Sequence, residues 1–272
     1  MKAIDVHGHY GNHDRGQGDL GARLRSASIE EVCERARAAG IALTVVSPLQ
    51  SFHPYRGRIL EANDDARRVS EAHDDIRFWA VLDPRRKETY RQVEELLAHP
   101  RCKGIKLHPV NHRYEILDYG DEVFEFAAAQ RAVVLTHSGD PGSFPEDFIP
   151  FTNRHAEVTL ILGHLGHSTD GNVSRQVYAI QQSIPRNVYV DTSSARSIMS
   201  GLIEWAVEQI GTDRILFGTD TPVYSAASQK ARVAYAGIDE AAKRAIFYEN
   251  AARLLDEKIA QGAGENSGDK SL

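Results

Sequence analysis

Cysteine, tryptophan and methionine are scarce in this sequence, which has two of each among 272 residues. The two cysteines, Cys33 and Cys102, lie far apart and belong to no Cys-x-x-Cys motif. This spacing excludes a disulfide-stapled scaffold and a cysteine-rich zinc module. We therefore expect two buried, reduced thiols, as is typical of a cytoplasmic protein.

Long hydrophobic runs and an excess of positive charge are also missing. No apolar stretch approaches the roughly 20 residues that cross a bilayer, and no secretory signal precedes the first apolar run. The 32 Lys and Arg residues are outnumbered by 38 Asp and Glu, and the net charge is −6. We expect a cytoplasmic protein with neither a membrane nor a nucleic acid as a partner.

Short apolar runs alternate with amphipathic stretches along most of the chain. Such alternation indicates a parallel sheet with helical crossovers. The region 28–39, for example, begins with Ser28 and has Glu31 three residues later, the spacing of a capping box. Further helices are expected at 59–73, 88–98, 122–130, 173–183, 203–210 and 240–258. Strands are expected at 3–9, 42–47, 77–82, 104–108, 132–137, 159–164, 188–192 and 215–219.

Eight such units in this length predict a (β/α)₈ TIM barrel, a fold of about 250 residues. The alternative is an open, doubly wound sheet, but no Gly-x-Gly-x-x-Gly follows the first strand. We expect a single catalytic domain over residues 1–259. Residues 260–272 are rich in glycine and polar residues, so we expect a disordered tail there.

The first expected strand ends in His7-Gly8-His9. Residues two apart on a strand share a face, so the two imidazoles project side by side. Neutral imidazole is the commonest metal ligand among side chains. An isolated His-x-His also occurs by chance, so the pair indicates a metal site only together with other residues.

Further polar residues occur where other expected strands end. They are Lys106 and His108 on one face of the fourth strand, His137 on the fifth, His164 on the sixth and Asp220 after the eighth. Barrel active sites lie at the carboxyl ends of the strands. Buried imidazoles and carboxylates are costly unless they are paired or coordinated, and a divalent cation compensates them. The sequence therefore predicts a divalent metal site.

These residues resemble the amidohydrolase superfamily over nearly the whole chain. Four local phrases extend the resemblance: GIKLHP (104–109), GHLG (163–166), FGTDTP (217–222) and YENAARLL (248–255). They are similar to the amidohydrolase-related branch that includes aminocarboxymuconate-semialdehyde decarboxylase, resorcylate decarboxylases and pyrone-dicarboxylate lactonase.

The resemblance implies that His7, His9, His137 and Asp220 hold one ion, most simply Zn²⁺, with His164 beside it as an acid or base. In other branches a carboxylated lysine on the fourth strand bridges two ions, and the histidine of the sixth strand binds the second. Lys106 is suitably placed for that role, and His108 is a competing inward group. One ion is the simpler expectation and two remain open.

Such a centre lowers the pKa of bound water toward about 7. We therefore expect a hydrolase that cleaves an amide, lactone or ester in a small carboxylated or cyclic substrate, with Asp220 transferring the proton. The first alternative is a non-oxidative decarboxylase on the same scaffold, although the short chain favours hydrolysis. The second is a non-catalytic metal-binding barrel, but structural zinc sites often use cysteine, and none lies at a strand end.

Loop residues beyond the strand ends are candidates for gripping the substrate. Arg196 follows the seventh strand and could fork onto a carboxylate, and Asn111 and His112 follow the fourth. Asp5 is a candidate partner that fixes a histidine tautomer, and His167 is a further site candidate. The expected partner is a small molecule, and a homo-oligomer stays open because such assemblies are common.

Overall fold

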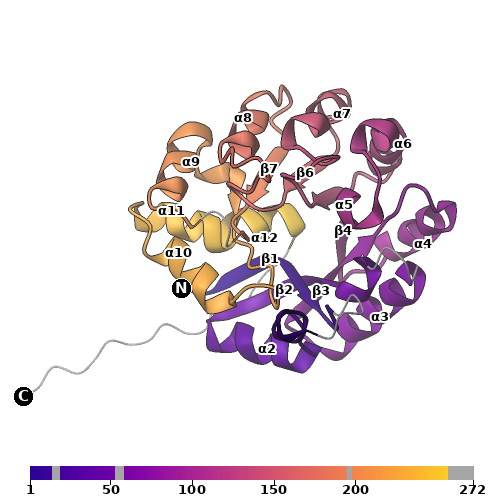
Figure 1. The fold of residues 1–272 in the computed structure, drawn as a ribbon, viewed down its shortest axis with the longest axis horizontal. Helices are drawn as coiled ribbons and strands as arrows, with labels where there is room; N and C mark the ends of the chain where they lie inside the picture. The colour runs from indigo at the N-terminus through magenta and orange to yellow at the C-terminus, as the bar shows by residue number, and fades with distance from the viewer. Residues whose placement is uncertain (14–18, 53–57, 195–197, 257–272) are drawn as a thin grey trace, which may run out of the picture.

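The computed structural model describes residues 1–13, 19–52, 58–194 and 198–256. Eight parallel strands form one sheet in the order β1 to β8 (Figure 1). Each strand pairs with its neighbours in the sequence, the arrangement that successive β-α-β units with short connections favour. The strands are β1 Ala3–Tyr10, β2 Ile41–Pro48, β3 Ile76–Val81, β4 Cys102–Leu107, β5 Val133–Thr136, β6 Thr159–Leu162, β7 Val188–Asp191 and β8 Ile215–Leu216.

The sheet closes on itself between β1 and the residues at and just after β8. The amide of Val6 donates to the carbonyl of Phe217 (2.9 Å), and the amide of Asp220 donates to the carbonyl of His7 (2.7 Å). A parallel bridge joins Gly8 to Thr221. The fold is therefore a (β/α)₈ barrel, as the alternation predicts, and not an open sheet.

Helices surround the strands (Figure 1). The capping box of α2 is confirmed, because Ser28 accepts from the Glu31 amide and Glu31 reaches back to the Ser28 amide. The longer helices are α2 Ile29–Ala38, α3 Ile59–Ala72, α4 Lys87–Leu97, α6 Ile116–Ala129, α8 Arg175–Gln181, α9 Leu202–Ile210 and α10 Ala226–Ala234. The shorter ones are α1 Leu20–Leu24, α5 Pro109–His112, α7 Ile149–Arg154, α11 Glu240–Arg244 and α12 Asn250–Leu255, with turns η1 Leu49–Phe52, η2 Pro145–Phe148, η3 Thr212–Arg214 and η4 Ala245–Glu249.

Two of the expected helices differ in the structure, and α10 lies where no helix was expected. Helix α6 begins at Ile116, six residues before the expected start, and runs through Gly120. Glycine disfavours a helix, but here a Cβ would lie 2.3 Å from the Phe151 ring, so tertiary packing accounts for the residue. The helix expected at 240–258 is interrupted by one π-helical turn, η4, between α11 and α12.

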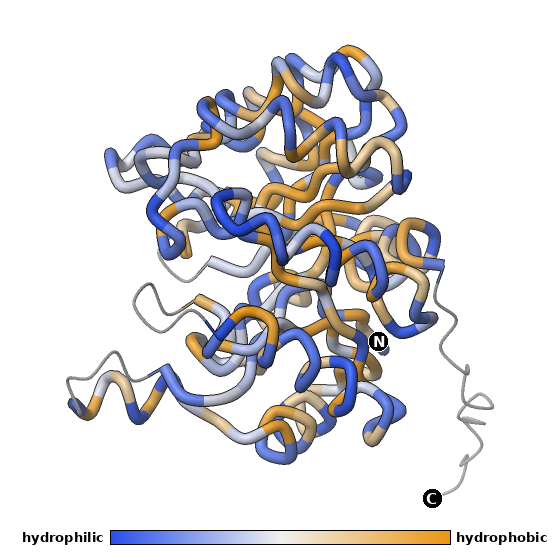
Figure 2. Tube along the Cα trace, turned by 90° about the vertical axis from the view of Figure 1, so that its right-hand side faces the viewer, coloured by the Kyte–Doolittle hydropathy of each residue, from blue (hydrophilic) through white to orange (hydrophobic). Residues whose placement is uncertain are grey.

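The core has two layers. The barrel interior holds an apolar cluster that includes Trp79, whose Nε1 donates to the Val6 carbonyl (2.9 Å), and α12 contributes Ala251 and Leu255 to this cluster. A larger cluster lies between strands and helices. Figure 2 shows the hydrophobic segments concentrated on the central strands. With its base filled by side chains, the barrel leaves its carboxyl end for chemistry.

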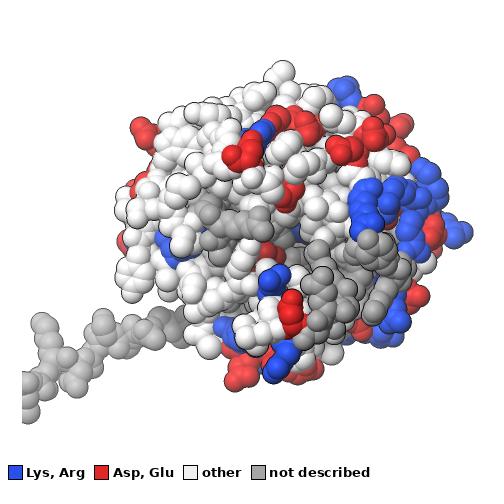
Figure 3. Space-filling view, in the orientation of Figure 1, with Lys and Arg blue, Asp and Glu red and all other residues white. Residues whose placement is uncertain are grey.

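The outside of the molecule carries charges of both signs. Figure 3 shows Lys and Arg interspersed with Asp and Glu around the periphery of one face. Within the described ranges, no helix combines the length and the apolar character needed to cross a bilayer.

Candidate metal centre and active site

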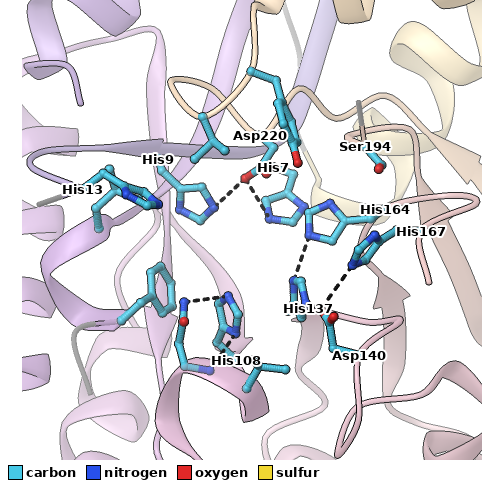
Figure 4. Close-up of a pocket in the computed structure, with 16 residues that line it drawn as sticks. His7, His9, His13, His108, His137, Asp140, His164, His167, Ser194 and Asp220 are labelled. Carbon is cyan, nitrogen blue, oxygen red and sulfur yellow. Dashed lines mark hydrogen bonds and ion pairs between the residues drawn. The ribbon is translucent and has the colours of Figure 1, made fainter. Parts of the chain in front are cut away.

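A cavity of about 310 Å³ lies at the carboxyl ends of the strands. Its polar wall is made mainly of imidazoles and carboxylates, and its apolar wall includes Phe52 and Val223 (Figure 4). The polar lining residues are His7, His9, His13, His108, Asn111, His137, Asp140, His164, His167, Ser194, Asp220 and Tyr224.

The two histidines of β1 reach this cavity from one strand. His7 Nδ1 lies 2.7 Å from Asp191 Oδ2, and His9 Nδ1 lies 2.9 Å from the Ser47 carbonyl oxygen. Both partners accept hydrogen bonds, so each Nδ1 carries the proton. The lone pair of each imidazole is therefore on Nε2, the nitrogen that a metal would use.

Asp220 completes a compact group with these histidines. It follows β8 in the left-handed backbone region (φ 57°), where a non-glycine residue is a mark of functional sites. Its Oδ1 lies 3.0 Å from His9 Nε2 and 3.9 Å from His7 Nε2. One ligand atom from each of the three residues lies within 4.8 Å of the others.

This geometry fits a divalent cation. His9 Nε2 and Asp220 Oδ1 both present lone pairs to each other at 3.0 Å. Two facing acceptors repel unless a proton or a cation lies between them. Nitrogen and carboxylate ligands of this kind suit Zn²⁺ and related divalent ions, so the residues themselves support a metal centre.

Lys106 lies beside this group, on the inner face of β4 as its parity predicts. Its Nζ is 2.8 Å from His7 Nε2 and the side chain is fully buried. Burial lowers the pKa of the Lys106 ammonium to about 8. The lysine is close enough to take part in a binuclear centre, and the alternative of two ions stays open.

His137 and His164 follow β5 and β6, and their rings are in contact on one side of the cavity. His137 Nδ1 lies 3.0 Å from His164 Nε2, and His137 Nε2 lies 2.5 Å from Asp140 Oδ2. His164 also has a left-handed backbone (φ 74°). Among the described residues, the compact groups containing His137 do not include His7, His9 or Asp220. The expected four-ligand set is thus split between two neighbouring clusters.

Of the residues expected after β4, two line the cavity and one does not. The His108 ring stacks on that of His137 with centroids 4.4 Å apart, and Asn111 contacts His108. His112 is only 3% exposed, and its Nε2 donates to the Ser51 carbonyl (2.9 Å). The expected substrate contact for His112 is corrected, because the short helix α5 aims it at η1 instead.

Two other expected residues have different outcomes. Arg196 lies outside the described residues. Asp5 does not fix the ring of His7, because the β1 pairing shifts between Asp5 and Gly8 and breaks the simple alternation of faces. Asp5 instead accepts from the backbone amide of His7 and from Thr219, and burial raises its pKa to about 7.

Sequence reasoning missed two carboxylates around the imidazoles. Asp191 at the end of β7 contacts His7, and Asp140 contacts both His137 and His167. Ser193, a loop residue that the sequence places just after the seventh strand, contacts His164. A signal was available in the repeated spacing His137-x-x-Asp140 and His164-x-x-His167. Asp191 was recognisable only as a polar residue at a strand end.

Burial sets the protonation of the cluster. It lowers the pKa values of His7, His108, His137 and His164, so these rings are neutral and able to act as ligands. At Asp140 burial raises the pKa, but hydrogen bonds from His137 and His167 outweigh it and lower the pKa overall. The site thus pairs neutral imidazoles with ionised Asp140.

Comparisons with known proteins agree with this architecture. The chain is similar to 5-carboxyvanillate decarboxylase from Sphingomonas paucimobilis (16% identity, TM-score 0.72, covering 95% of this chain and 100% of that one). It is also similar to 2,6-dihydroxybenzoate decarboxylase from Rhizobium (17% identity, TM-score 0.72, covering 94% of this chain and 98% of that one). A third similar structure is that of a dihydroxybenzoic acid decarboxylase from Polaromonas sp. JS666 with bound manganese and 2-nitroresorcinol (16% identity, TM-score 0.73, covering 94% of this chain and 97% of that one).

No curated protein matches the chain in sequence. A family model described as Amidohydrolase matches residues 4–256, which include all of the barrel strands except the first residue of β1, and every imidazole of the cavity. The chain therefore belongs to the amidohydrolase family.

Proposed function

We propose that this protein is a metal-dependent decarboxylase that releases CO₂ from a small aromatic or unsaturated carboxylic acid. The observation that carries the choice is the structural similarity to several decarboxylases over 94–95% of the chain. On sequence grounds the short chain favoured hydrolysis. That argument no longer distinguishes the two reactions, because the match extends over 97–100% of those decarboxylase chains.

His7, His9 and Asp220 would hold the divalent ion, with His137 completing the set by a small movement of its ring. Zn²⁺ is our expectation from the ligand types, and Mn²⁺ is the other candidate because a similar decarboxylase contains it. The ion would supply a positive charge that binds and polarises the substrate.

The chain's own residues then have distinct tasks. The cavity of about 310 Å³ is at the lower end of the range for small-molecule sites and suits a single ring. Asn111 lines it and is placed to orient a substrate oxygen, and Arg196 is our candidate for gripping a carboxylate. His164 and Asp220 would carry the proton: one of them accepts it from an acidic hydroxyl of the substrate or from water and gives it to the carbon that loses the carboxylate. The bond to the carboxylate breaks as the C–H bond forms, so one proton is consumed and one CO₂ leaves.

The test compares decarboxylation with hydrolysis on the same preparation. The protein is loaded with Zn²⁺ or Mn²⁺ and incubated with dihydroxybenzoates, 5-carboxyvanillate and dienoic acids, while ¹³CO₂ release is measured. Run in D₂O, decarboxylation places deuterium at the carbon that lost the carboxylate. A parallel panel of lactones, esters and amides measures hydrolysis.

The variant His164→Asn provides the control for catalysis. We expect it to retain the metal and to lose about 10²–10⁴-fold in turnover, as removal of an acid or base does. Turnover of the lactone or amide panel without CO₂ release would overturn the decarboxylase proposal in favour of a hydrolase. Metal binding with no turnover of any substrate would favour a non-catalytic barrel.

A further inference from the structure

Asp191 is the most heavily hydrogen-bonded carboxylate of the site. It ends β7 and is fully buried. Its Oδ2 lies 2.7 Å from His7 Nδ1. Its Oδ1 accepts from the backbone amides of His164 (3.0 Å) and Ser193 (2.9 Å) and from the Ser193 hydroxyl.

The Ser193 hydroxyl links the Asp191 carboxylate to the imidazole of His164 through hydrogen bonds. A hydroxyl has one proton, and Ser193 donates it to Asp191 Oδ1. The Ser193 oxygen is then an acceptor for His164 Nδ1, which lies 2.8 Å away. This contact favours the form of His164 that carries its proton on Nδ1, as His7 does. On the other side of the ring, His164 Nε2 lies 3.0 Å from His137 Nδ1, and His137 donates from its own Nε2 to Asp140, so this longer contact favours the opposite form.

We propose that Asp191 is a positioning residue that sets one tautomer in two histidines: it holds His7 directly, and through the shorter Ser193 contact (2.8 Å) it outweighs His137 at His164, so that Nε2 of both rings is unprotonated toward the cavity. The contact with His7 prepares a metal ligand, and the relay through Ser193 prepares the acid or base. This inference rests on the metal centre of the proposed function, but not on which reaction the centre performs.

The local backbone is shaped around this carboxylate. A Cβ added to Gly218 would lie 3.0 Å from Asp191 Cγ and 3.1 Å from its Oδ1, so a larger residue would press on the group. Asp191 also lies between two strands that supply site residues, because β7 pairs with β6 and β8. The carboxylate can therefore couple residues that are 184 and 27 positions away from it in sequence.

The tautomers can be measured directly in the metal-free wild-type protein. Long-range ¹H–¹⁵N spectra of ¹⁵N-histidine protein distinguish Nδ1–H from Nε2–H rings, and His164→Asn removes the His164 signals and so assigns them. We expect Nδ1–H for both His7 and His164. A dominant Nε2–H form in either ring would overturn the inference. Because the tautomers are measured in the wild-type protein, the result does not depend on whether an Asp191 variant folds.

Asp191→Asn and Ser193→Ala separate the two branches of the relay. In Asp191→Asn the amide oxygen faces the Ser193 and His164 donors, so the amide NH₂ faces His7 and shifts its proton to Nε2. We expect Zn²⁺ affinity, measured by competition with a chromophoric chelator, to fall about 10–100-fold. Ser193→Ala removes a 3.1 Å contact with His7 Nδ1 but leaves the shorter 2.7 Å contact with Asp191, so it should lower Zn²⁺ affinity far less than Asp191→Asn and alter mainly the His164 signals.

Two results would contradict the relay. One is an Asp191→Asn protein that binds Zn²⁺ as wild type does, with His7 still in the Nδ1–H form. The other is a Ser193→Ala protein that loses Zn²⁺ affinity as much as Asp191→Asn. Both readouts are independent of turnover, so a failed search for CO₂ release would leave them valid.

Discussion

Nε2 of His9 and Oδ1 of Asp220 lie 3.0 Å apart, and each presents a lone pair to the other. His9 belongs to β1 and Asp220 follows β8. An ion between them therefore links the first strand to the segment that follows the last strand. Metal binding should stabilise the closed barrel as well as prepare the chemistry.

Asp220→Asn tests this repulsion through thermal stability. The new amide NH₂ can donate to His9 Nε2, a net hydrogen bond of about 1 kcal/mol, so the metal-free variant should melt about 2–4 °C above metal-free wild type. Adding Zn²⁺ or Mn²⁺ should raise the melting temperature of wild type but not of the variant. Asp118→Asn, at an exposed position of α6, is the control, and equal metal responses in wild type and Asp220→Asn would refute the assignment.

The number of ions is tested at Lys106. Its Nζ lies 2.8 Å from His7 Nε2. We expect one ion per chain in the wild type and in Lys106→Met, which keeps the side-chain bulk without the amine. Plasma mass spectrometry on protein purified without chelators gives the count. Two ions in the wild type, with one lost in the variant, would establish a lysine-bridged pair and favour hydrolysis.

Gly120 should resist substitution although it lies within a helix. Gly120→Ala adds a Cβ 2.3 Å from the Phe151 ring, and such overpacking costs about 1–3 kcal/mol. This exceeds the helix propensity gain of about 1 kcal/mol, so urea unfolding should show net destabilisation. Phe151→Leu in the same chain should relieve part of it. Gly21→Ala in α1, where the nearest atoms belong to the flexible Arg25 side chain (3.1 Å) and to Asp19 Oδ1 (3.3 Å), is the control and should cost far less than Gly120→Ala.

The two cysteines should be inert in the folded protein. Burial raises the pKa of the Cys33 thiol to about 12 and that of Cys102 to about 11, and the thiolate is the reactive form. At pH 8 a disulfide reagent should therefore titrate neither thiol until denaturant is added, when both react. Rapid labelling of the native protein would show that the thiols are more accessible than their burial indicates.

The fold and the strand-end residues could be predicted because they follow from local patterns. The alternation of apolar runs placed all eight strands, and His7, His9, His108, His137, His164 and Asp220 all line the cavity. The expected strands at 132–137, 159–164 and 215–219 run past the observed ends of β5, β6 and β8. His137, His164 and Asp220 lie in the turns beyond those ends, and two of them have left-handed backbones that periodicity cannot reveal.

The partners of these residues could not be predicted, because they depend on contacts distant in sequence. Asp191 meets His7 across 184 positions, and nothing local distinguishes it from a capping or solvent-exposed aspartate. The bulge in β1 turned Asp5 away from the imidazole, and the short helix α5 turned His112 toward η1. A one-residue irregularity changes which face a side chain occupies, so parity arguments fail at these positions.

The closure of the barrel through Asp220 and His7 has a consequence for biosynthesis. The amide of Asp220 donates to the carbonyl of His7. One edge of β1 therefore stays unpaired until a segment more than 200 residues later in the sequence has been synthesised. Contacts at such separation form slowly, and unpaired strand edges invite association while they wait. A nascent chain released before Asp220 would lack the segment that pairs with β1 and the aspartate that we propose as a metal ligand. Translation pauses or truncations upstream of β8 should therefore yield aggregates rather than partially active enzyme.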